Sequence, residues 1–376
     1  MKIYLDNAAT TRVSEEVLAE MLPILKNSFG NPSSTHSFGR EARVLIEKSR
    51  KKIAELLNVT PSEIYFTSGG TESDNTAIRG GIKQRSIQNV ITSKLEHHAV
   101  LHTLEELESS GEIKISFVEF DEKGIISLDH LEELLKKNKK AFVSLMHGNN
   151  EIGNINPIKD FGELCHNYEA IFHSDTVQTI GHVKIDLQDI NINYIVGSAH
   201  KFHGPKGVGF LYARKDSKLP SFISGGGQER NLRGGTENVY GIVGMAKAFE
   251  FAISNLEKEK AYIKGLKNRM IEGLKENIPG IAFNGNSDKL DNSLYTVLNV
   301  SIPPSDENGL LLFNLDLAGI CASGGSACAS GAQTGSHVIN ALGLNPQNGI
   351  IRFSFCKYNS AEEIDFTIEQ LKKILA

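Results

Sequence analysis

The chain has no run of about eighteen apolar residues, and residues 1–6 contain no apolar core of the kind found in signal peptides. It also has no strong excess of either charge, because 40 Lys and Arg residues face 45 Asp and Glu residues and give a formal charge of −5. These absences argue against a membrane-spanning helix, give no support for a role in nucleic-acid binding, and predict a cytoplasmic protein.

Cysteine is scarce, with only Cys165, Cys321, Cys328 and Cys356. The four form no CxxC pair and show no metal-ligand spacing, so the sequence predicts free thiols and no metal site. A single cysteine taken alone is more often a small buried hydrophobic residue than a nucleophile. The chain shows no internal repeat and no linker-like disordered stretch.

What the chain does contain is an alternation of short apolar strands and amphipathic helices from Ile64 onward. The candidate strands are residues 64–67, 90–92, 113–119, 141–146, 170–173, 194–196 and 207–212. The candidate helices are residues 15–26, 39–57, 71–79, 98–108, 128–137 and 159–167. This order predicts an α/β fold with a mostly parallel central sheet covered by helices, and places ligands at the carboxyl ends of the strands.

A long charged helical pattern at 239–277 marks the expected boundary between two domains. Strand patterns at 293–300 and 350–355, with helical patterns at 309–315, 336–342 and 361–375, predict a smaller α+β C-terminal domain. We expect a large domain over residues 13–255 and a small domain over residues 256–376 that also includes residues 1–12. The stretch 322–335, rich in Gly and Ser, falls in the small domain.

Chemically distinctive residues follow several of the predicted strands. Lys201 stands between two apolar runs, and a lysine whose pKa is lowered by burial is a good amine nucleophile for carbonyl groups. Asp175 ends an apolar strand, where its carboxylate needs a partner such as the protonated pyridine nitrogen of pyridoxal phosphate (PLP). Simpler interpretations stay open, since Lys201 could be a loop lysine and Asp175 could cap the next segment.

Three further segments offer ligand-binding groups. Gly69 and Gly70 open a helix and let the backbone approach an anion. His97 begins another helix and could stack on a cofactor ring and shuttle protons, or could have no such task. Arg230 and Arg233 stand in a Gly-rich loop that suits a phosphate or carboxylate and is equally typical of an exposed flexible loop. Together with Lys201 and Asp175, the Gly69–Gly70 turn and His97 indicate one site, because each follows a predicted strand.

Ten segments, in order along the chain, resemble those of cysteine desulfurases of the NifS/IscS kind, within the aminotransferase class V, fold-type I PLP enzymes. They are YLDNAATT, GNPSSTHSFG, TSGGTESDN, LEHHAV, NNEIG, HSDTVQ, SAHKFHGPKGVG, GGGQERNLRGGT, SGGSACAS and IRFS. The resemblance covers essentially the whole chain. It implies PLP-dependent conversion of L-cysteine to L-alanine, with the sulfur transferred to an enzyme cysteine as a persulfide.

The resemblance assigns roles to individual residues. Lys201 would form the Schiff base with PLP and remove the substrate Cα proton, and Cys328 would be the catalytic cysteine. Asp175 would pair with the pyridinium nitrogen, Gln178 would bind the phenolic oxygen, and His97 would stack on the ring and help move protons. The phosphate would be bound by Gly70, Thr71, Ser198 and His200, and by Thr236 from the partner subunit of a homodimer. The substrate would be bound by Asn150 and Arg352, and Asn150 would also lie beside the cofactor.

The same resemblance implies a sulfur-acceptor protein, such as an iron–sulfur scaffold or a tRNA-thiolation carrier, and no direct nucleic-acid or membrane partner. Cys328 could transiently contact a nascent iron–sulfur cluster. The alternatives are a selenocysteine lyase or a class V aminotransferase, neither of which needs Cys328, and a non-catalytic scaffold, which the presence of Lys201 and Asp175 disfavours. Cys356 stands where relatives often have Gly and is interpreted as a small filler, with a second reactive thiol as the alternative. The C-terminal extension that some relatives use to meet a scaffold is expected to be absent.

Overall fold

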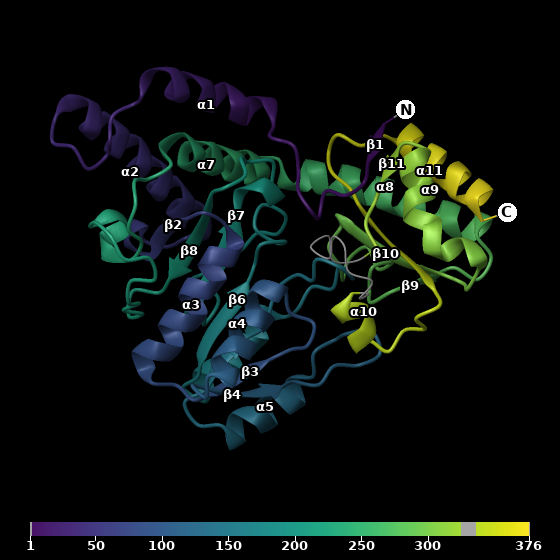
Figure 1. Ribbon diagram of the computed structural model, residues 1–376, viewed down its shortest axis with the longest axis horizontal. Coiled ribbons are helices and arrows are strands. Elements are labelled where there is room, and N and C mark those ends of the chain that lie inside the picture. The colour runs from purple at the N-terminus through teal and green to yellow at the C-terminus, as the bar shows by residue number, and fades with distance from the viewer. Residues whose placement is uncertain (1, 325–335, 376) are drawn as a thin grey trace.

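The computed structural model describes residues 2–324 and 336–375, which form a larger and a smaller part (Figure 1). The larger part is built on a sheet of seven strands and the smaller part on a sheet of three strands. One apolar core gathers buried side chains between Val17 and Ala252, and another gathers Ile3 and Leu5 with side chains between Ile263 and Leu371. The domain bounds at 13–255 and 256–376, with 1–12 in the small domain, stay a prediction that this grouping supports.

The large sheet has the strand order β2-β8-β7-β6-β5-β3-β4. Its strands are β2 (Ile64–Thr67), β3 (Asn89–Thr92), β4 (Lys114–Phe117), β5 (Phe142–Ser144), β6 (Ile171–Asp175), β7 (Tyr194–Ser198) and β8 (Gly209–Ala213). Only β8 runs antiparallel to its neighbours, so the predicted mostly parallel sheet is confirmed. Every residue of β6 and β7 is buried, as expected for strands covered on both faces.

Helices cover this sheet, and α3 and α4 lie in front of it in Figure 1. The helices of the larger part are α1 (Glu15–Asn27), α2 (Ser37–Leu57), α3 (Gly70–Arg85), α4 (His98–Ser109), α5 (Leu128–Lys137), α6 (Ile158–Asn167) and α7 (Val239–Ser254). Helix α3 continues six residues past its predicted end at 79. A Cβ on Gly81 would lie 2.8 Å from Cε2 of Phe142, so glycine lets the helix pack closely on the sheet. None of the described helices could span a membrane.

The single long helix predicted over 239–277 is wrong. The structure has two helices, α7 and α8 (Leu256–Asn277), which meet at Asn255. Asn255 has φ −109° and ψ 6°, and its side-chain Nδ2 donates to the carbonyl of Phe251 at 2.9 Å. A short amide side chain can satisfy the last carbonyls of a helix, and this ends α7 within an otherwise continuous helical pattern.

The smaller part contains the antiparallel strands β9 (Ala282–Phe283), β10 (Val297–Ile302) and β12 (Gly349–Ser354). Its helices are α8, α9 (Leu311–Leu317), α10 (His337–Ala341) and α11 (Ala361–Ile374). The N-terminal strand β1 (Ile3–Tyr4) pairs with β11 (Ile320–Cys321). Both chain ends therefore lie at the smaller part (Figure 1). The two-residue strands β1, β9 and β11 were not predicted, because two residues carry no readable periodicity.

Candidate active site

A cavity of about 220 Å³ lies at the carboxyl ends of the central strands, where an α/β sheet places its ligands. The predicted site residues that line it are Gly70, Thr71, His97, Asn150, Asp175, Gln178, Ser198, His200, Lys201 and Arg352. Nine of these ten come from α3 and the strand ends of the larger part, and Arg352 comes from β12 of the smaller part. The structure therefore gathers these residues in one place, and their individual roles stay predictions.

Lys201 ends the short 3₁₀ helix η2 (Ala199–Lys201), directly after β7. Its Nζ donates to the carbonyl oxygens of Ala8 at 2.6 Å and Ala9 at 2.9 Å. Its own backbone carbonyl lies 3.0 Å from Nε2 of His182, whose pKa is lowered by burial. Lys201 is thus held at both its backbone and its amine, and it faces the cavity instead of open solvent.

Asp175 is the last residue of β6 and pairs with Val196 of β7. Its Oδ1 accepts a hydrogen bond from the backbone N–H of Val177 at 2.9 Å, and the residue is buried. Gln178 donates from Nε2 to the carbonyl of Ala8 at 3.0 Å. Asp175 therefore caps the turn after its strand, as the simpler interpretation expects, and also lines the cavity.

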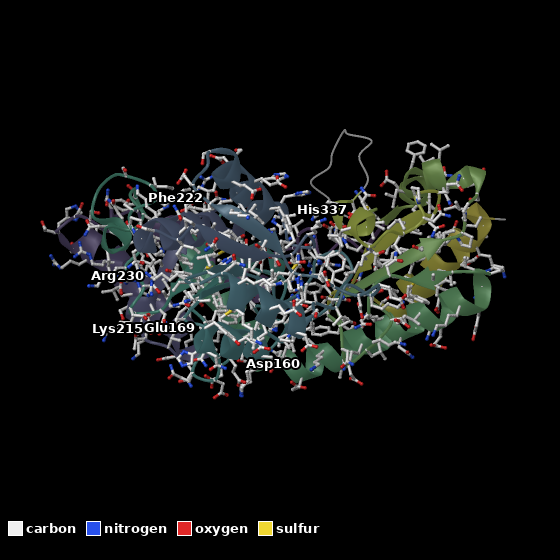
Figure 2. All side chains as sticks on the ribbon, turned by 90° about the horizontal axis from the view of Figure 1, so that it is seen from below. Asp160, Glu169, Lys215, Phe222, Arg230 and His337 are labelled. Atoms are coloured by element: carbon white, nitrogen blue, oxygen red, sulfur yellow. The ribbon has the colours of Figure 1, made fainter. Side chains whose placement is uncertain are left out.

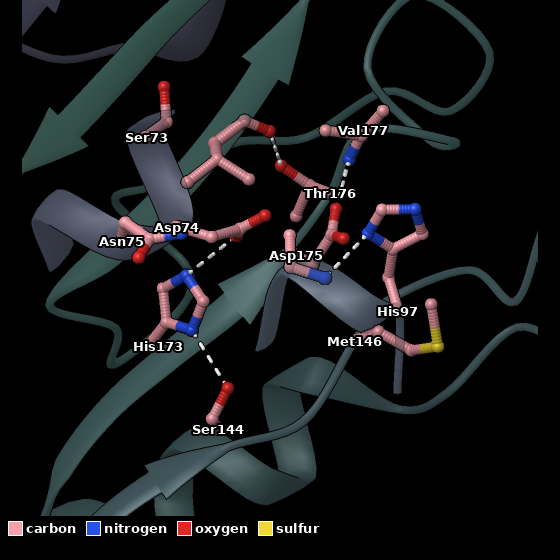
Figure 3. A network of polar contacts seen from close by, with 12 residues as sticks. Ser73, Asp74, Asn75, His97, Ser144, Met146, His173, Asp175, Thr176 and Val177 are labelled. Carbon is pink, nitrogen blue, oxygen red and sulfur yellow. Dashed lines mark hydrogen bonds and ion pairs between the residues drawn. The ribbon is translucent and has the colours of Figure 1, made fainter. Parts of the chain in front are cut away.

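A second buried carboxyl group, Asp74 of α3, also lines the cavity. Asp74, His173 and Ser144 lie in a row (Figure 3). Oδ1 of Asp74 lies 3.3 Å from Nε2 of His173, and Nδ1 of His173 lies 2.9 Å from Oγ of Ser144. Burial, and then the charges of Asp175 and Glu96, raise the pKa of Asp74 well above its usual range. Burial lowers the pKa of His173 to about 3. Both shifts favour the uncharged forms of these two side chains.

His97 is the N-cap of α4, and its Nδ1 accepts a hydrogen bond from the backbone N–H of Ala99 at 3.1 Å (Figure 3). The pKa of His97 is lowered, mainly by burial; the charge of Lys201 lowers it further, and the charge of Asp175 opposes the change. A neutral imidazole that accepts at Nδ1 carries its proton at Nε2. His97 thus presents one N–H donor from the rim of the cavity.

The predicted anion-binding turn lies at the start of α3, where Gly70 and Thr71 line the cavity. A Cβ on Gly70 would lie 2.7 Å from Cγ2 of Val177, so glycine lets the start of α3 pack closely against Val177. His200 contacts Oγ1 of Thr10 through Nδ1 at 3.1 Å. Burial, with smaller effects of Lys201 and Lys206, lowers the pKa of His200 to about 4, so His200 can offer a phosphate a neutral hydrogen bond.

Arg352 reaches the cavity from the smaller part and is buried. Its Nη1 donates to the carbonyl oxygen of Asn150 at 3.0 Å, and its Nη2 donates to Oδ1 of Asp6 at 2.9 Å. Among the described residues, its Nε has no hydrogen-bond partner. A guanidinium at a cavity wall suits a carboxylate ligand.

Two predicted residues are not part of this cavity as described. Thr236 lines a separate cavity of about 140 Å³ together with Arg233 and Glu229, so its predicted contact with a phosphate of the other subunit stays a prediction. Cys328 lies outside the described residues. Of the described cysteines, Cys165 and Cys356 are buried, and burial raises the pKa of both thiols. This burial supports the interpretation of Cys356 as a filler.

Sequence reasoning missed Asp74 and the carbonyls of Ala8 and Ala9. The available signal for Asp74 was its spacing, since it follows Gly70 by four residues and so lies on the same face of α3. The N-terminal segment was considered only as one of the segments that resemble the family, and nothing in its composition indicates that residues 8 and 9 contact Lys201. That contact depends on the chain crossing from the smaller to the larger part, since Asn7 donates to the carbonyl of Ser354 and Thr11 donates to that of His200.

The groups at the cavity fit PLP, which carries an aldehyde, a pyridine nitrogen and a phosphate. Lys201 supplies an amine for the aldehyde, and Asp175 supplies a carboxylate for the nitrogen. The start of α3, where Gly70 and Thr71 line the cavity, supplies the helix N-terminus that suits a phosphate. Neutral His97 adds a flat ring at the same cavity.

Comparison with known proteins gives a consistent result. Residues 3–366 match the aminotransferase class-V family. The chain is 43% identical to cysteine desulfurase IscS of Clostridium botulinum over all of its length and 94% of that protein's. A solved NifS-like protein superposes with a TM-score of 0.91 at 38% identity, covering 100% of this chain and 99% of that one. The solved structure of SspA in complex with cysteine gives a TM-score of 0.82 at 34% identity, covering 96% and 100%.

Proposed function

The chain belongs to the aminotransferase class-V family, and from this premise we propose that it is a PLP-dependent cysteine desulfurase. It converts L-cysteine to L-alanine and takes the sulfur onto one of its own cysteines as a persulfide. The observation that carries the proposal is the single cavity at which Lys201, Asp175 and Arg352 meet. An amine, a buried carboxylate and a guanidinium can respectively attach a carbonyl cofactor, balance a pyridinium charge and hold a substrate carboxylate.

The residues of the chain divide the first half of the reaction among them. PLP, when bound, supplies an electron sink for the electron pair left on the substrate Cα. Lys201 Nζ removes the Cα proton, and the carbonyls of Ala8 and Ala9 orient this amine. Arg352 holds the substrate carboxylate with its guanidinium at the cavity wall. His97 holds a proton at Nε2 that it can return to a carbon or sulfur atom of the substrate.

Cys328 is the proposed nucleophile for the second half. Its thiolate attacks the substrate sulfur, so that an S–S bond forms, the Cβ–S bond breaks, and the released electron pair is protonated on carbon. L-cysteine and one enzyme thiol thus give L-alanine and one persulfide, with no further oxidant. Burial makes Cys165 and Cys356 poor substitutes, since a raised thiol pKa disfavours the thiolate.

The proposal includes a homodimer in which Thr236 contacts the phosphate held by the partner subunit. It also includes delivery of the persulfide sulfur to an acceptor protein, such as an iron–sulfur scaffold or a thiolation carrier, in the cytoplasm. The similarity to a solved structure titled as a complex with cysteine supports L-cysteine as the substrate.

The test is an assay of the purified protein with PLP, L-cysteine and a thiol reductant, which should release alanine and sulfide in equal amounts. Cys328→Ala should lose nearly all sulfide release. The matched control is Cys321→Ala, which removes a thiol from β11 and should keep the activity. If neither alanine nor sulfide appears, the proposal is wrong. If Cys328→Ala keeps full turnover, an aminotransferase or lyase reaction is favoured instead.

A further inference from the structure

The substrate-facing arginine already has a counter-ion inside the protein. Arg352 is one of the largest fully buried side chains, and Asp6 accepts a hydrogen bond from its Nη2 at 2.9 Å. Among the described residues, Asp6 is the one carboxylate that forms an ion pair with Arg352. Of the two side chains, only Arg352 lines the cavity. A ligand carboxylate therefore approaches a guanidinium whose charge is already partly balanced.

The same carboxylate oxygen has a second donor. The hydroxyl of Ser323 donates to Oδ1 of Asp6 at 2.8 Å. The backbone of Ser323 also pairs with that of Arg352, with N–H to O distances of 3.3 Å and 2.6 Å in the two directions. Asp6 thus holds together the N-terminal segment, strand β12 and the residue five positions before Cys328.

We propose that Asp6 is a positioning residue that sets the affinity of Arg352 for the substrate carboxylate. It holds the guanidinium in place through Nη2 and weakens ligand binding by its own negative charge. Ser323 moderates this effect, because a hydrogen-bond donor on Oδ1 draws charge away from the side of the carboxylate that meets Arg352. The inference rests on the proposed function for the identity of the ligand, an amino acid carboxylate.

The sign of the effect follows from the number of negative charges on one cation. When the ligand is bound, two carboxylates share the Arg352 guanidinium, and they repel one another at a separation of a few ångströms in a largely buried site. When Asp6 is replaced by Asn, an amide oxygen still accepts the hydrogen bond from Nη2 but brings no charge. The buried guanidinium then lacks its counter-ion until a ligand carboxylate arrives, so ligand binding becomes more favourable.

The experiment measures the dissociation constant of the reaction product, L-alanine, by calorimetry on the PLP-loaded protein. Asp6→Asn should bind L-alanine about threefold to tenfold more tightly than the wild type. Asp6→Glu, which keeps the charge, should lie closer to the wild type than to Asp6→Asn. The control is Asp189→Asn, which removes the charge of an exposed aspartate and should leave the dissociation constant unchanged. In cysteine turnover, Asp6→Asn should lower KM more than it changes kcat.

A merely structural role for Asp6 gives a different result, namely a lower melting temperature with unchanged or weaker L-alanine binding, and that result overturns the proposal. Ser323→Ala provides a second variant of opposite sign: it keeps both charges and should weaken L-alanine binding about twofold. Should Asp6→Asn fail to fold, this variant decides, since unchanged or tighter binding by Ser323→Ala also overturns the proposal. Loss of alanine and sulfide production from the wild type, with these affinity changes intact, would contradict the desulfurase function alone.

Discussion

Two lysines in different parts of this protein are held in the same way. Nζ of Lys201 donates to the carbonyls of Ala8 and Ala9, and Nζ of Lys267 on α8 donates to Oγ of Ser293 and the carbonyl of Leu294, both at 2.8 Å. Lys267 is the more deeply buried, with 0% of its surface exposed, and burial lowers its pKa to about 7. By burial alone, Lys267 would be the better candidate for an amine nucleophile.

The difference between the two sites is access. Lys201 lines a cavity that is also lined by Asp175 and Arg352. Lys267, on α8, is instead covered by the loop that contains Ser293 and Leu294. No ligand can contact Lys267 without opening the smaller part. A buried amine therefore indicates an active site only where a cavity and groups that match a ligand surround it.

The largest expected effect separates the two lysines by activity. Lys201→Ala should lose the visible absorbance of the cofactor after dialysis and reduce alanine formation by about 10³-fold or more, because the amine that attaches the cofactor and moves the Cα proton is gone. Lys267→Met should keep the absorbance and the rate, since Lys267 is not among the described residues that line the cavity. Equal losses in the two variants would remove the distinction between the sites.

The next effect compares two carboxyl groups that both line the cavity. Asp175→Asn removes the carboxylate proposed to balance the pyridinium and should lower the rate about 10²-fold or more. Asp74→Asn should change the rate far less, because burial raises the pKa of Asp74 and so favours its uncharged form, which an amide resembles in size and charge. A loss as large in Asp74→Asn as in Asp175→Asn would show that Asp74 also acts as a carboxylate.

The sequence predicts features that depend on neighbouring residues, but it does not predict contacts between residues far apart in the chain. The central sheet and most of the site were predictable, because Lys201, Asp175 and Gly70 follow apolar strands and the carboxyl ends of parallel strands meet at one edge. The burial of Lys267 was not predictable, since Lys267 lies in a charged helical pattern that indicates an exposed helix. Its burial depends on Ser293 and Leu294, which follow it by 26 and 27 positions and pack back against α8.

The junction between α7 and α8 and the contact between the two parts were also not predicted. Asn255 interrupts a continuous helical pattern through a side-chain hydrogen bond, which periodicity does not register. The meeting of the two parts was also unpredictable. His337 of α10, labelled in Figure 2, packs against His98 of α4 with ring centroids 4.3 Å apart and the rings tilted by 45°, although 239 positions separate them in the chain. Such contacts are set by packing between the two parts, and single-sequence patterns carry no record of them.

A third test uses the pH dependence of stability. The pKa of Lys267 is about 7 in the folded protein against an ordinary value of 10.5, with burial as the main cause, Asp288 opposing it and Lys264 adding to it. Between these pH values the unfolded chain binds a proton that the folded chain does not, so the cost of burying Lys267 is fully present below pH 7 and disappears as the pH rises to 10.5. Urea unfolding should therefore show the stability of the wild type rising relative to Lys267→Met by about 3.5 kcal/mol between pH 7 and pH 10.

The control for this test is Lys258→Met, which removes an exposed lysine of the same helix. Its stability relative to the wild type should not vary over this pH range. Parallel curves for Lys267→Met and the wild type would mean that Lys267 stays protonated in the folded protein, and the contrast with Lys201 would then concern access alone.

The smallest effect concerns the hydrogen bonds that make Lys267 acceptable inside the smaller part. A neutral amine has two N–H bonds, and Ser293 and Leu294 supply two acceptors for them, whereas the third N–H of an ammonium group would need a further partner. Ser293→Ala removes one acceptor and should lower the free energy of unfolding by about 1 kcal/mol at pH 9, with alanine formation unchanged. In Lys267→Met the same Ser293→Ala change should cost less, because the methionine side chain has no donor to leave unpaired. Equal costs in the two backgrounds would show that Ser293 acts through its other hydrogen bond, to the carbonyl of Lys289, and that Leu294 alone accounts for the way Lys267 is held.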